Sequence, residues 1–161
     1  YLQLIEKLKK ANSNIKLSSD FIIGYPGETQ DDFKETLKLM KNIKFINSYS
    51  FVFSGRPGTP SFNLKKIDDN ITKERLAIFQ NTSKKIKKEY RNTLLTKIMP
   101  VLFENKTKNE NEYFGRDECF NSVIVKCDDN LIGKIKLVKI NKVNQSTLFG
   151  EAMNENNQRV A

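Results

Sequence analysis

The sequence predicts two successive folds, an α/β segment over residues 1–92 and a small all-β barrel over residues 93–153. Before residue 93, apolar residues recur at helical spacing in stretches that alternate with β-like runs. After it, five short β-type runs are separated by polar turns within about 60 residues. The basic residues are also unevenly distributed, because 18 basic and 10 acidic side chains give residues 1–92 a net charge of +8 out of the total of +9.

The first segment is predicted to form helix, strand, helix and strand. Residues 1–11 and 29–43 carry apolar side chains at spacings of three and four, and Thr29 precedes two aspartates as at a helix N-terminus. Residues 15–24 and 45–54 are rich in β-branched and aromatic side chains, which favour strands. Because helix-sized segments connect these strands, we expect them to pair in parallel.

A long basic helix is predicted to follow over residues 72–91. Its inward positions are apolar, small or aromatic: Leu76, Phe79, Ser83, Ile86 and Tyr90. Its exposed positions include four lysines, which are candidates for contact with a nucleic acid such as RNA: Lys84, Lys85, Lys87 and Lys88. Such a patch attracts phosphates by releasing their counterions. The solvated face of an amphipathic helix explains the same charges without a ligand, and charge alone leaves both interpretations open.

The second segment is predicted to form five strands that close into a small antiparallel β-barrel. The expected strands cover residues 97–104, 112–116, 122–127, 133–143 and 147–152. Residues 154–161 are expected to be a polar tail. The sequence displays no internal repeat.

The composition excludes several kinds of site. The chain has no histidine, which removes histidine-based triads and histidine-ligated metals. Cys119 and Cys127 are eight residues apart and match neither a metal-ligand pair nor a redox dithiol, so we expect two reduced structural cysteines. The longest apolar runs are too short for a transmembrane helix. Abundant lysine and asparagine with only two cysteines lead us to expect a cytoplasmic protein. Because Tyr1 opens directly on a helical pattern, we also expect a fragment of a longer protein.

Two loops that directly follow predicted strands are candidate ligand-binding elements. Ligands of parallel α/β proteins bind beyond the carboxyl ends of the strands. There Gly24 and Gly27 would let a ligand approach the backbone, and Glu28 could accept hydrogen bonds from a ribose or an amine. In the second loop, Arg56 could hold a carboxylate or phosphate. A tight turn and a rigid connector explain these loops equally well, and the residues alone do not decide.

A third candidate element lies in the β segment, where Phe114 and Arg116 belong to the run Tyr113–Arg116. Small β-barrels bind RNA with aromatic and basic side chains on an open face. A core phenylalanine beside a surface arginine is the alternative interpretation. The similar run Leu148–Gly150 is predicted to be core and turn.

The motifs taken together resemble a known family. "SDFIIGYPGETQDDF" followed by "SYSFVFSGRPGTP" resembles the C-terminal half of the radical-SAM methylthiotransferases. "VLFENKTK", "YFGRDE" and "TLFGEAM" resemble the TRAM domain that ends those enzymes. The resemblance covers about residues 1–153. It implies that residues 1–92 are the C-terminal portion of a radical-SAM (β/α) partial TIM barrel, and that residues 93–153 are an OB-like TRAM barrel that binds RNA.

Within that family, the sequence resembles the branch that adds a methylthio group to C2 of N6-prenylated adenosine next to the tRNA anticodon. Arg56 and Pro57 argue against the branch that modifies a ribosomal protein. The branch that acts on threonylcarbamoyladenosine carries a similar loop, and only the aromatic segment "SYSFVFS" disfavours it. A non-catalytic TRAM-type RNA-binding protein is a further alternative.

The resemblance implies cofactors and partners. The full-length protein would use S-adenosylmethionine, two 4Fe-4S clusters and an external electron donor, and would bind the tRNA anticodon stem-loop. In this chain it implies that Ile22, Gly24, Glu28 and Arg56 line the S-adenosylmethionine or substrate cavity, and that Phe114 and Arg116 contact RNA. No catalytic or metal-ligating residue is expected within these residues, so the chain alone would be inactive. We expect a monomer that binds no membrane.

Overall fold

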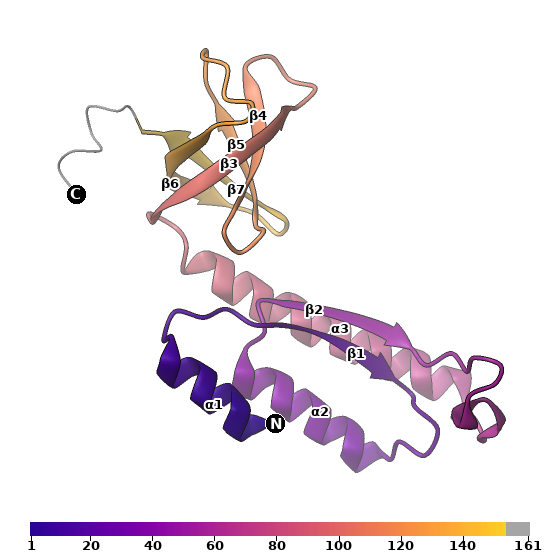
Figure 1. The fold of residues 1–161 in the computed structure, drawn as a ribbon. Helices are drawn as coiled ribbons and strands as arrows, with labels where there is room; N and C mark the ends of the chain where they lie inside the picture. The colour runs from indigo at the N-terminus through magenta and orange to yellow at the C-terminus, as the bar shows by residue number, and fades with distance from the viewer. Residues whose placement is uncertain (154–161) are drawn as a thin grey trace. The chain divides into compact units, whose positions relative to one another are not determined.

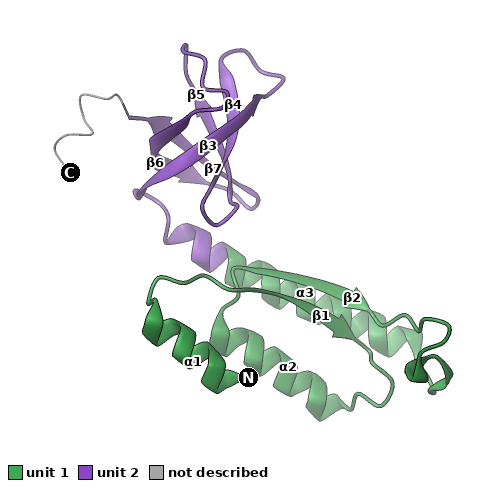
Figure 2. Cartoon of the chain, in the orientation of Figure 1, with its two compact units in different colours: residues 1–87 green, residues 88–161 purple. Residues whose placement is uncertain are grey.

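The computed structural model describes residues 1–153, and it divides the chain into two compact units, residues 1–87 and residues 88–161 (Figures 1 and 2). The polar tail predicted at residues 154–161 lies outside the described residues. Each unit has its own hydrophobic core, and each is described by itself below.

The first unit alternates helices and strands, as the sequence predicts. In chain order its elements are α1 (Leu2–Ala11), β1 (Ser18–Ile23), α2 (Gln30–Ile43), β2 (Asn47–Val52), the short 3₁₀ helix η1 (Pro60–Asn63) and α3 (Asp69–Asn92), whose last residues belong to the second unit. Helix α3 begins three residues before the predicted Thr72, because the carboxylate of Asp68 accepts the Asn70 N–H (2.8 Å) and caps the first turn.

The two strands of this unit leave one face of their sheet open. They pair in parallel, from Ser18 opposite Asn47 to Ile23 opposite Val52, which confirms the expected pairing. One face packs on all three helices, as Figure 1 shows for α1 and α2. The shared core contains Ile5, Ile23, Phe33, Met40, Ile43, Phe45, Phe79 and Ile86. The side chains with the opposite alternation remain exposed: Ile22 at 61%, Tyr49 at 59% and Phe51 at 58%.

The N-terminus of α2 is capped as predicted. The Thr29 hydroxyl accepts the Asp32 N–H (3.1 Å), and the Asp32 carboxylate accepts the Thr29 N–H (2.9 Å), which completes a capping box. The hydrogen bonds from Thr29 lower the pKa of Asp32. The capping box thereby fixes the residue at which the turn after β1 ends and α2 begins.

The second unit is a closed five-stranded barrel. Its strands are β3 (Ile98–Lys106), β4 (Glu112–Asp117), β5 (Ser122–Lys126), β6 (Ile135–Val143) and β7 (Thr147–Ala152), in the order β3-β4-β5-β7-β6. The prediction of an entirely antiparallel barrel is wrong for one pair, because β5 and β7 are parallel. A closed ring with an odd number of strands cannot alternate in direction throughout, so at least one neighbouring pair must run in parallel.

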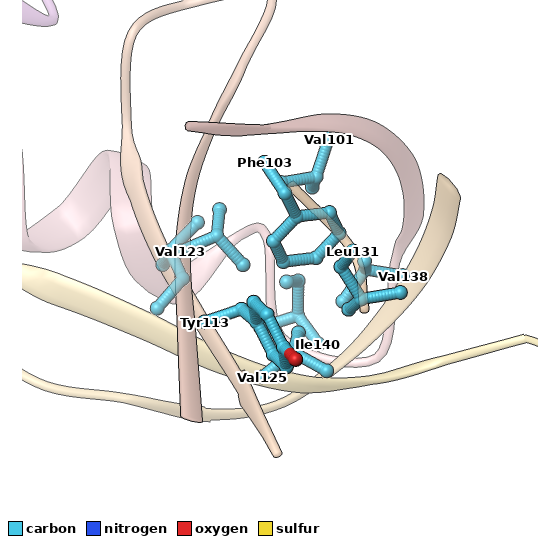
Figure 3. Close-up of a cluster of buried hydrophobic side chains, with 9 residues drawn as sticks. Val101, Phe103, Tyr113, Val123, Val125, Leu131, Val138 and Ile140 are labelled. Atoms are coloured by element: carbon cyan, nitrogen blue, oxygen red, sulfur yellow. The ribbon is translucent and has the colours of Figure 1, made fainter. Parts of the chain in front are cut away.

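Alternate residues of the five strands fill the barrel (Figure 3). The cluster consists of Val101, Phe103, Tyr113, Val123, Val125, Leu131, Val138, Ile140 and Leu148, each at most 2% exposed. Of these, Leu131 comes from the β5–β6 connection and not from a strand. Small barrels are filled by side chains in this way, so binding sites lie on their outer surface or at their loops.

The hairpins β3–β4 and β6–β7 repeat the same structure. Each has a register shift at the corresponding place, between Phe103 and Asn105 and between Ile140 and Lys142. The strand that faces each shift carries a Phe-Gly dipeptide, which is Phe114-Gly115 in β4 and Phe149-Gly150 in β7. A Cβ atom on Gly115 would lie 2.5 Å from the carbonyl oxygen of the facing strand, and one on Gly150 would meet the same distance. The repeat is not visible in the sequence, because the two hairpin connections differ in length and few residue types coincide.

Candidate functional site

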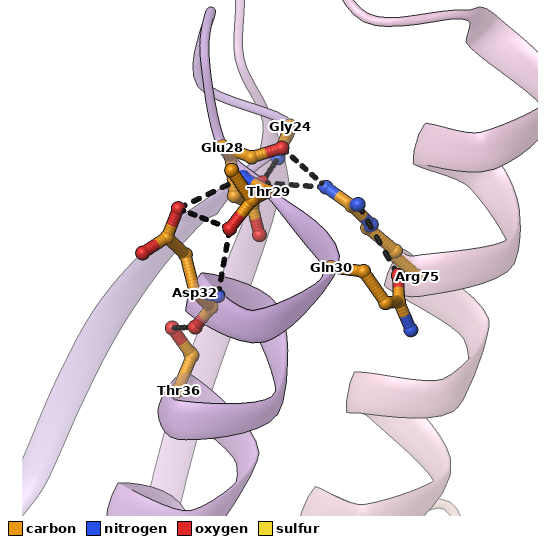
Figure 4. A network of polar contacts seen from close by, with 7 residues as sticks. All are labelled: Gly24, Glu28, Thr29, Gln30, Asp32, Thr36 and Arg75. Atoms are coloured by element: carbon orange, nitrogen blue, oxygen red, sulfur yellow. Dashed lines mark hydrogen bonds and ion pairs between the residues drawn. The ribbon is translucent and has the colours of Figure 1, made fainter.

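The turn after β1 is held by a buried polar network (Figure 4). The Glu28 carboxylate accepts the Gly24 N–H (2.5 Å) and lies 3.6 Å from Nη1 of Arg75 on α3. The two charged side chains are 12% and 8% exposed. Arg75 also donates to the Glu28 carbonyl oxygen (3.0 Å) and to Oε1 of Gln30 (3.2 Å). The network therefore fixes the carboxyl end of β1 and the start of α2 against α3.

Gly24 is required by the packing of α3. It has a φ of +76°, and a Cβ atom there would lie 2.6 Å from Cγ2 of Thr72. The close approach that the sequence predicts at Gly24 is thus made by a side chain of the same unit. Sequence reasoning also missed Arg75, because no local pattern links it to Glu28, 47 residues away.

The two predicted ligand loops lie side by side at the carboxyl ends of β1 and β2. The ring of Tyr25 in the first loop packs edge-on against Phe53 at the start of the second, with 5.0 Å between centroids. Ile22 lies on the open face opposite Phe51, and Arg56 is exposed in the second loop. Ile22 and the Arg56 guanidinium are therefore accessible, whereas the polar groups of Gly24 and Glu28 bind each other.

A groove of about 420 Å³ runs along β2, on the edge that does not pair with β1. It is lined by Ser48, Tyr49, Ser50 and Phe51 of β2 and by Gln80, Ser83, Lys84 and Lys87 of α3. Lys87 donates a hydrogen bond to Oδ1 of Asn47. The hydroxyl of Ser48 is buried and has no hydrogen-bond partner among residues 1–153. The groove thus combines aromatic rings, hydroxyl groups and ammonium groups.

The structure divides the four lysines of the basic helix. Lys84 and Lys87 line the groove, whereas Lys85 and Lys88 are exposed on α3 and do not. Arg91, in the same basic stretch, is 5% exposed and donates to the carbonyl oxygen of Gln145. Burial lowers the pKa of Arg91. Arg91 is therefore part of the packing of the second unit.

Phe114 and Arg116 lie together on the outer face of the barrel. Strand alternation places Tyr113 and Gly115 inside and these two residues outside. The Arg116 guanidinium lies 5.3 Å from the centroid of the Phe114 ring, and its Nε is 3.2 Å from Oε1 of Glu104. Phe114 is thus an outward ring with a cation beside it.

The described residues contain no metal site of ordinary composition. Within residues 1–153, no group of three or more histidine, cysteine, aspartate or glutamate side chains is placed to hold a metal ion. Cys119 and Cys127 are both free and half-buried. In the same range, no helix is both long enough and apolar enough to cross a membrane.

The barrel corresponds to a known domain class, since the family model of the TRAM domain matches residues 92–153. The whole chain is similar to enzymes named tRNA-2-methylthio-N(6)-dimethylallyladenosine synthase, which confirms the resemblance found in the sequence. It is 47% identical over 163 residues to that of Pelagibacter ubique (strain HTCC1062), which covers 100% of this chain and 36% of the relative.

Two further relatives of the same name agree. Identity is 41% over 156 residues with the synthase of Vesicomyosocius okutanii subsp. Calyptogena okutanii (strain HA), covering 96% of this chain and 35% of the relative. It is 41% over 162 residues with that of Buchnera aphidicola subsp. Baizongia pistaciae (strain Bp), covering 98% and 36%. The chain therefore spans about a third of the length of the curated relatives it matches.

Proposed function

We propose that this chain is the C-terminal part of a tRNA methylthiotransferase that adds a methylthio group to C2 of N6-prenylated adenosine next to the anticodon. The observation that carries the proposal is the similarity of the whole chain to synthases with that named product. Their names favour prenylated adenosine over threonylcarbamoyladenosine. A non-catalytic RNA-binding protein would leave the similarity of residues 1–91, outside the TRAM domain, without a reason.

In this proposal β1 and β2 are strands of a radical-SAM (β/α) barrel. Helices of such barrels cover the outside, and the reaction takes place at the carboxyl ends of the strands. The parallel pairing of β1 with β2 and the helices on a single face support this assignment. The open face with Ile22, Tyr49 and Phe51 would then line the interior of the barrel.

The accessible residues of the strand ends fit S-adenosylmethionine. This cofactor supplies the radical chemistry, while the protein positions the base and excludes water. Ile22 would offer an apolar surface to the adenine ring, and Arg56 would offer a guanidinium to the carboxylate of the cofactor, since both side chains are exposed. Gly24 and Glu28, which already bind each other, would hold the strand end in place.

The remaining cofactors and partners belong to the full-length enzyme. Ligands for the two 4Fe-4S clusters would come from residues outside this chain, and an external protein would supply electrons. The partner of this chain's own residues would be the anticodon stem-loop of a cytoplasmic tRNA, whose unpaired bases are accessible to aromatic and basic side chains.

Nucleoside mass spectrometry of tRNA tests the proposed activity. Cells that lack the gene should lose the methylthio group on prenylated adenosine and accumulate the prenylated nucleoside without it. A plasmid copy of the full-length gene should restore it, and unrelated modified nucleosides serve as the control. Loss of the methylthio group on threonylcarbamoyladenosine instead, or no change in any nucleoside, would contradict the proposal.

The lysines of α3 allow a matched test of tRNA binding. We expect Lys84→Gln with Lys87→Gln to weaken binding of tRNA and to reduce its salt dependence, because both side chains line the groove. Lys85→Gln with Lys88→Gln removes the same charge outside the groove and should weaken binding less. Equal losses from the two double variants would show that α3 contributes only net charge.

A further inference from the structure

We propose that the outer face of the barrel carries two neighbouring base-stacking sites for single-stranded RNA. The first is formed by Phe114 with Arg116. The second is a new site formed by Phe149 with Lys142, although the sequence predicts core and turn for Phe149. The inference rests on the proposed function, and it specifies how the barrel would hold unpaired bases.

Phe114 and Phe149 lie in one row across the barrel surface. The strand register places Phe114 opposite Ile124, Ile124 opposite Phe149, and Phe149 opposite Lys142. Phe114, Ile124 and Phe149 have outward alternation, because their chain neighbours Tyr113, Val123, Val125 and Leu148 are buried in the core. Lys142 is itself exposed. With about 4.8 Å between adjacent strands, the two phenylalanines stand about 10 Å apart. Ile124 forms an apolar surface between them.

Each ring has a cation next to it. Arg116 lies 5.3 Å from the centroid of Phe114, and Nζ of Lys142 lies 5.7 Å from the centroid of Phe149. Lys142 has no acidic partner within the described part of the chain, whereas Arg116 is paired with Glu104. A ring that accepts a base and a cation that accepts the adjacent phosphate are the two elements of single-strand binding.

Neither outward ring belongs to the core cluster of the barrel. In both hairpins the core cluster is built from inward residues, and the phenylalanine precedes the strand glycine on the outer surface. Both rings remain half-buried, with partly accessible surface. Two aromatic surfaces, each beside a positive charge, suit a ligand with stacked bases and a negative backbone. We therefore assign RNA as the occupant, ahead of an acidic peptide.

The test uses the whole chain and a fluorescently labelled anticodon stem-loop RNA, with binding measured by anisotropy at several salt concentrations. Phe149→Leu keeps an apolar side chain but removes the ring, and should weaken binding about 5- to 10-fold, as expected for the loss of one stacked base. Phe149→Tyr keeps the ring and should bind within about twofold of the parent chain.

Charge variants test the second element of the site. Lys142→Gln should weaken binding and lower the slope of log affinity against log salt by about 0.7, the value for one single-strand phosphate contact. Lys134→Gln, which precedes the opposite end of β6, removes the same charge outside the row and should leave the slope closer to that of the parent. Thermal unfolding of every variant shows whether the barrel remains folded.

The outcomes separate this inference from the proposed function. If the parent chain binds the RNA and Phe149→Leu binds equally well, the second stacking site is wrong and the proposed function stands. Equal losses for Phe149→Leu and Phe149→Tyr would also contradict stacking. If the parent does not bind the RNA, the RNA-binding role in the proposed function fails. Competition by polyglutamate as strong as by RNA would replace RNA with an acidic protein partner.

Discussion

The two hairpins of the barrel, β3–β4 and β6–β7, share their inner faces and differ on their outer faces. The inward positions correspond as Val101 with Val138, Phe103 with Ile140, Tyr113 with Leu148 and Gly115 with Gly150. The outward positions correspond as Leu102 with Lys139, Glu104 with Asn141, Asn105 with Lys142 and Arg116 with Glu151. Barrel closure thus constrains the first set, and the second set is open to functional selection.

One polar contact between the strands is kept in both hairpins with different chemistry. In β3–β4, the guanidinium of Arg116 pairs with the carboxylate of Glu104 at 3.2 Å. In β6–β7, Nδ2 of Asn141 donates to Oε1 of Glu151 at 3.1 Å. The geometry of the bulge is therefore compatible with either an ion pair or a neutral donor. The cation beside the outward phenylalanine is therefore Arg116 on β4 in the first hairpin and Lys142 on β6 in the second.

The largest expected effect comes from the inner faces. Phe103→Ala should cost about 3–5 kcal/mol of unfolding free energy, and Ile140→Ala about 2–5 kcal/mol, because each side chain is fully buried in the same core. Hydrogen exchange of the barrel amides measures these losses separately from those of the first unit. Leu102→Ala, an outward control at 44% exposure, should cost about 0.5 kcal/mol or less. A large loss at only one of the two core positions would contradict their equivalence.

The two strand glycines should come next. Gly115→Ala and Gly150→Ala each force a Cβ atom to within 2.5 Å of a carbonyl oxygen, and each should cost about 1–3 kcal/mol. Gly133→Ala, where no atom lies within 4 Å but φ is +74°, should cost about 1 kcal/mol from backbone strain alone. Thermal unfolding of the three variants ranks them. Equal small losses at all three positions would show that the strands yield locally.

The strength of local patterns decides how much of this fold can be predicted from the sequence. Periodicity located the α-helices and strands of both units, because their inward residues recur at regular spacing. It did not locate the 3₁₀ helix η1, whose four residues are too few to show a period. The parallel β5–β7 pair depends on the closure of five strands, and no single strand carries that information. The Glu28–Arg75 contact joins residues 47 apart through the packing of α3, so local patterns do not reveal it.

The candidate sites also divide into those that local alternation predicts and those that only tertiary packing reveals. The outward direction of Phe114 follows from the alternation around Tyr113 and Gly115. The outward direction of Phe149 follows from the same alternation beside the buried Leu148, but the prediction of core and turn for Leu148–Gly150 did not use it. The division of the lysines on α3 depends on how β2 lies beside the helix, which only the tertiary structure gives.

A charge comparison of the outer faces should have a smaller effect on stability and a measurable one on RNA binding. Arg116→Gln should cost about 0–1 kcal/mol, since the pair with Glu104 is exposed by about two fifths. It should weaken binding of the anticodon stem-loop several-fold and reduce the salt slope by about 0.7. Glu151→Gln, at the corresponding position, should not weaken binding. Similar losses from both variants would mean that the hairpins act through stability alone.

The smallest expected effect concerns the two hairpin connections. A titratable carboxylate closes the first, and a neutral amide closes the second. The Glu112 carboxylate accepts hydrogen bonds from Oγ1 of Thr107 (2.6 Å) and Nδ2 of Asn109 (2.8 Å), and these bonds lower its pKa below the ordinary value of 4.5. In the second connection, the Asn144 side-chain oxygen accepts the N–H groups of Ser146 (2.9 Å) and Thr147 (2.6 Å) and does not titrate.

Because its pKa is lower in the folded chain, Glu112 adds stability above about pH 4.5, and this contribution is lost as the pH falls through the folded pKa. Glu112→Gln should therefore lower the thermal midpoint slightly at pH 7 and match the parent chain in acid, where Glu112 is protonated. Asn144→Asp should introduce a similar acid-dependent term into the second connection. A constant difference between Glu112→Gln and the parent from pH 7 to acid would show that the carboxylate charge plays no part in closing the loop.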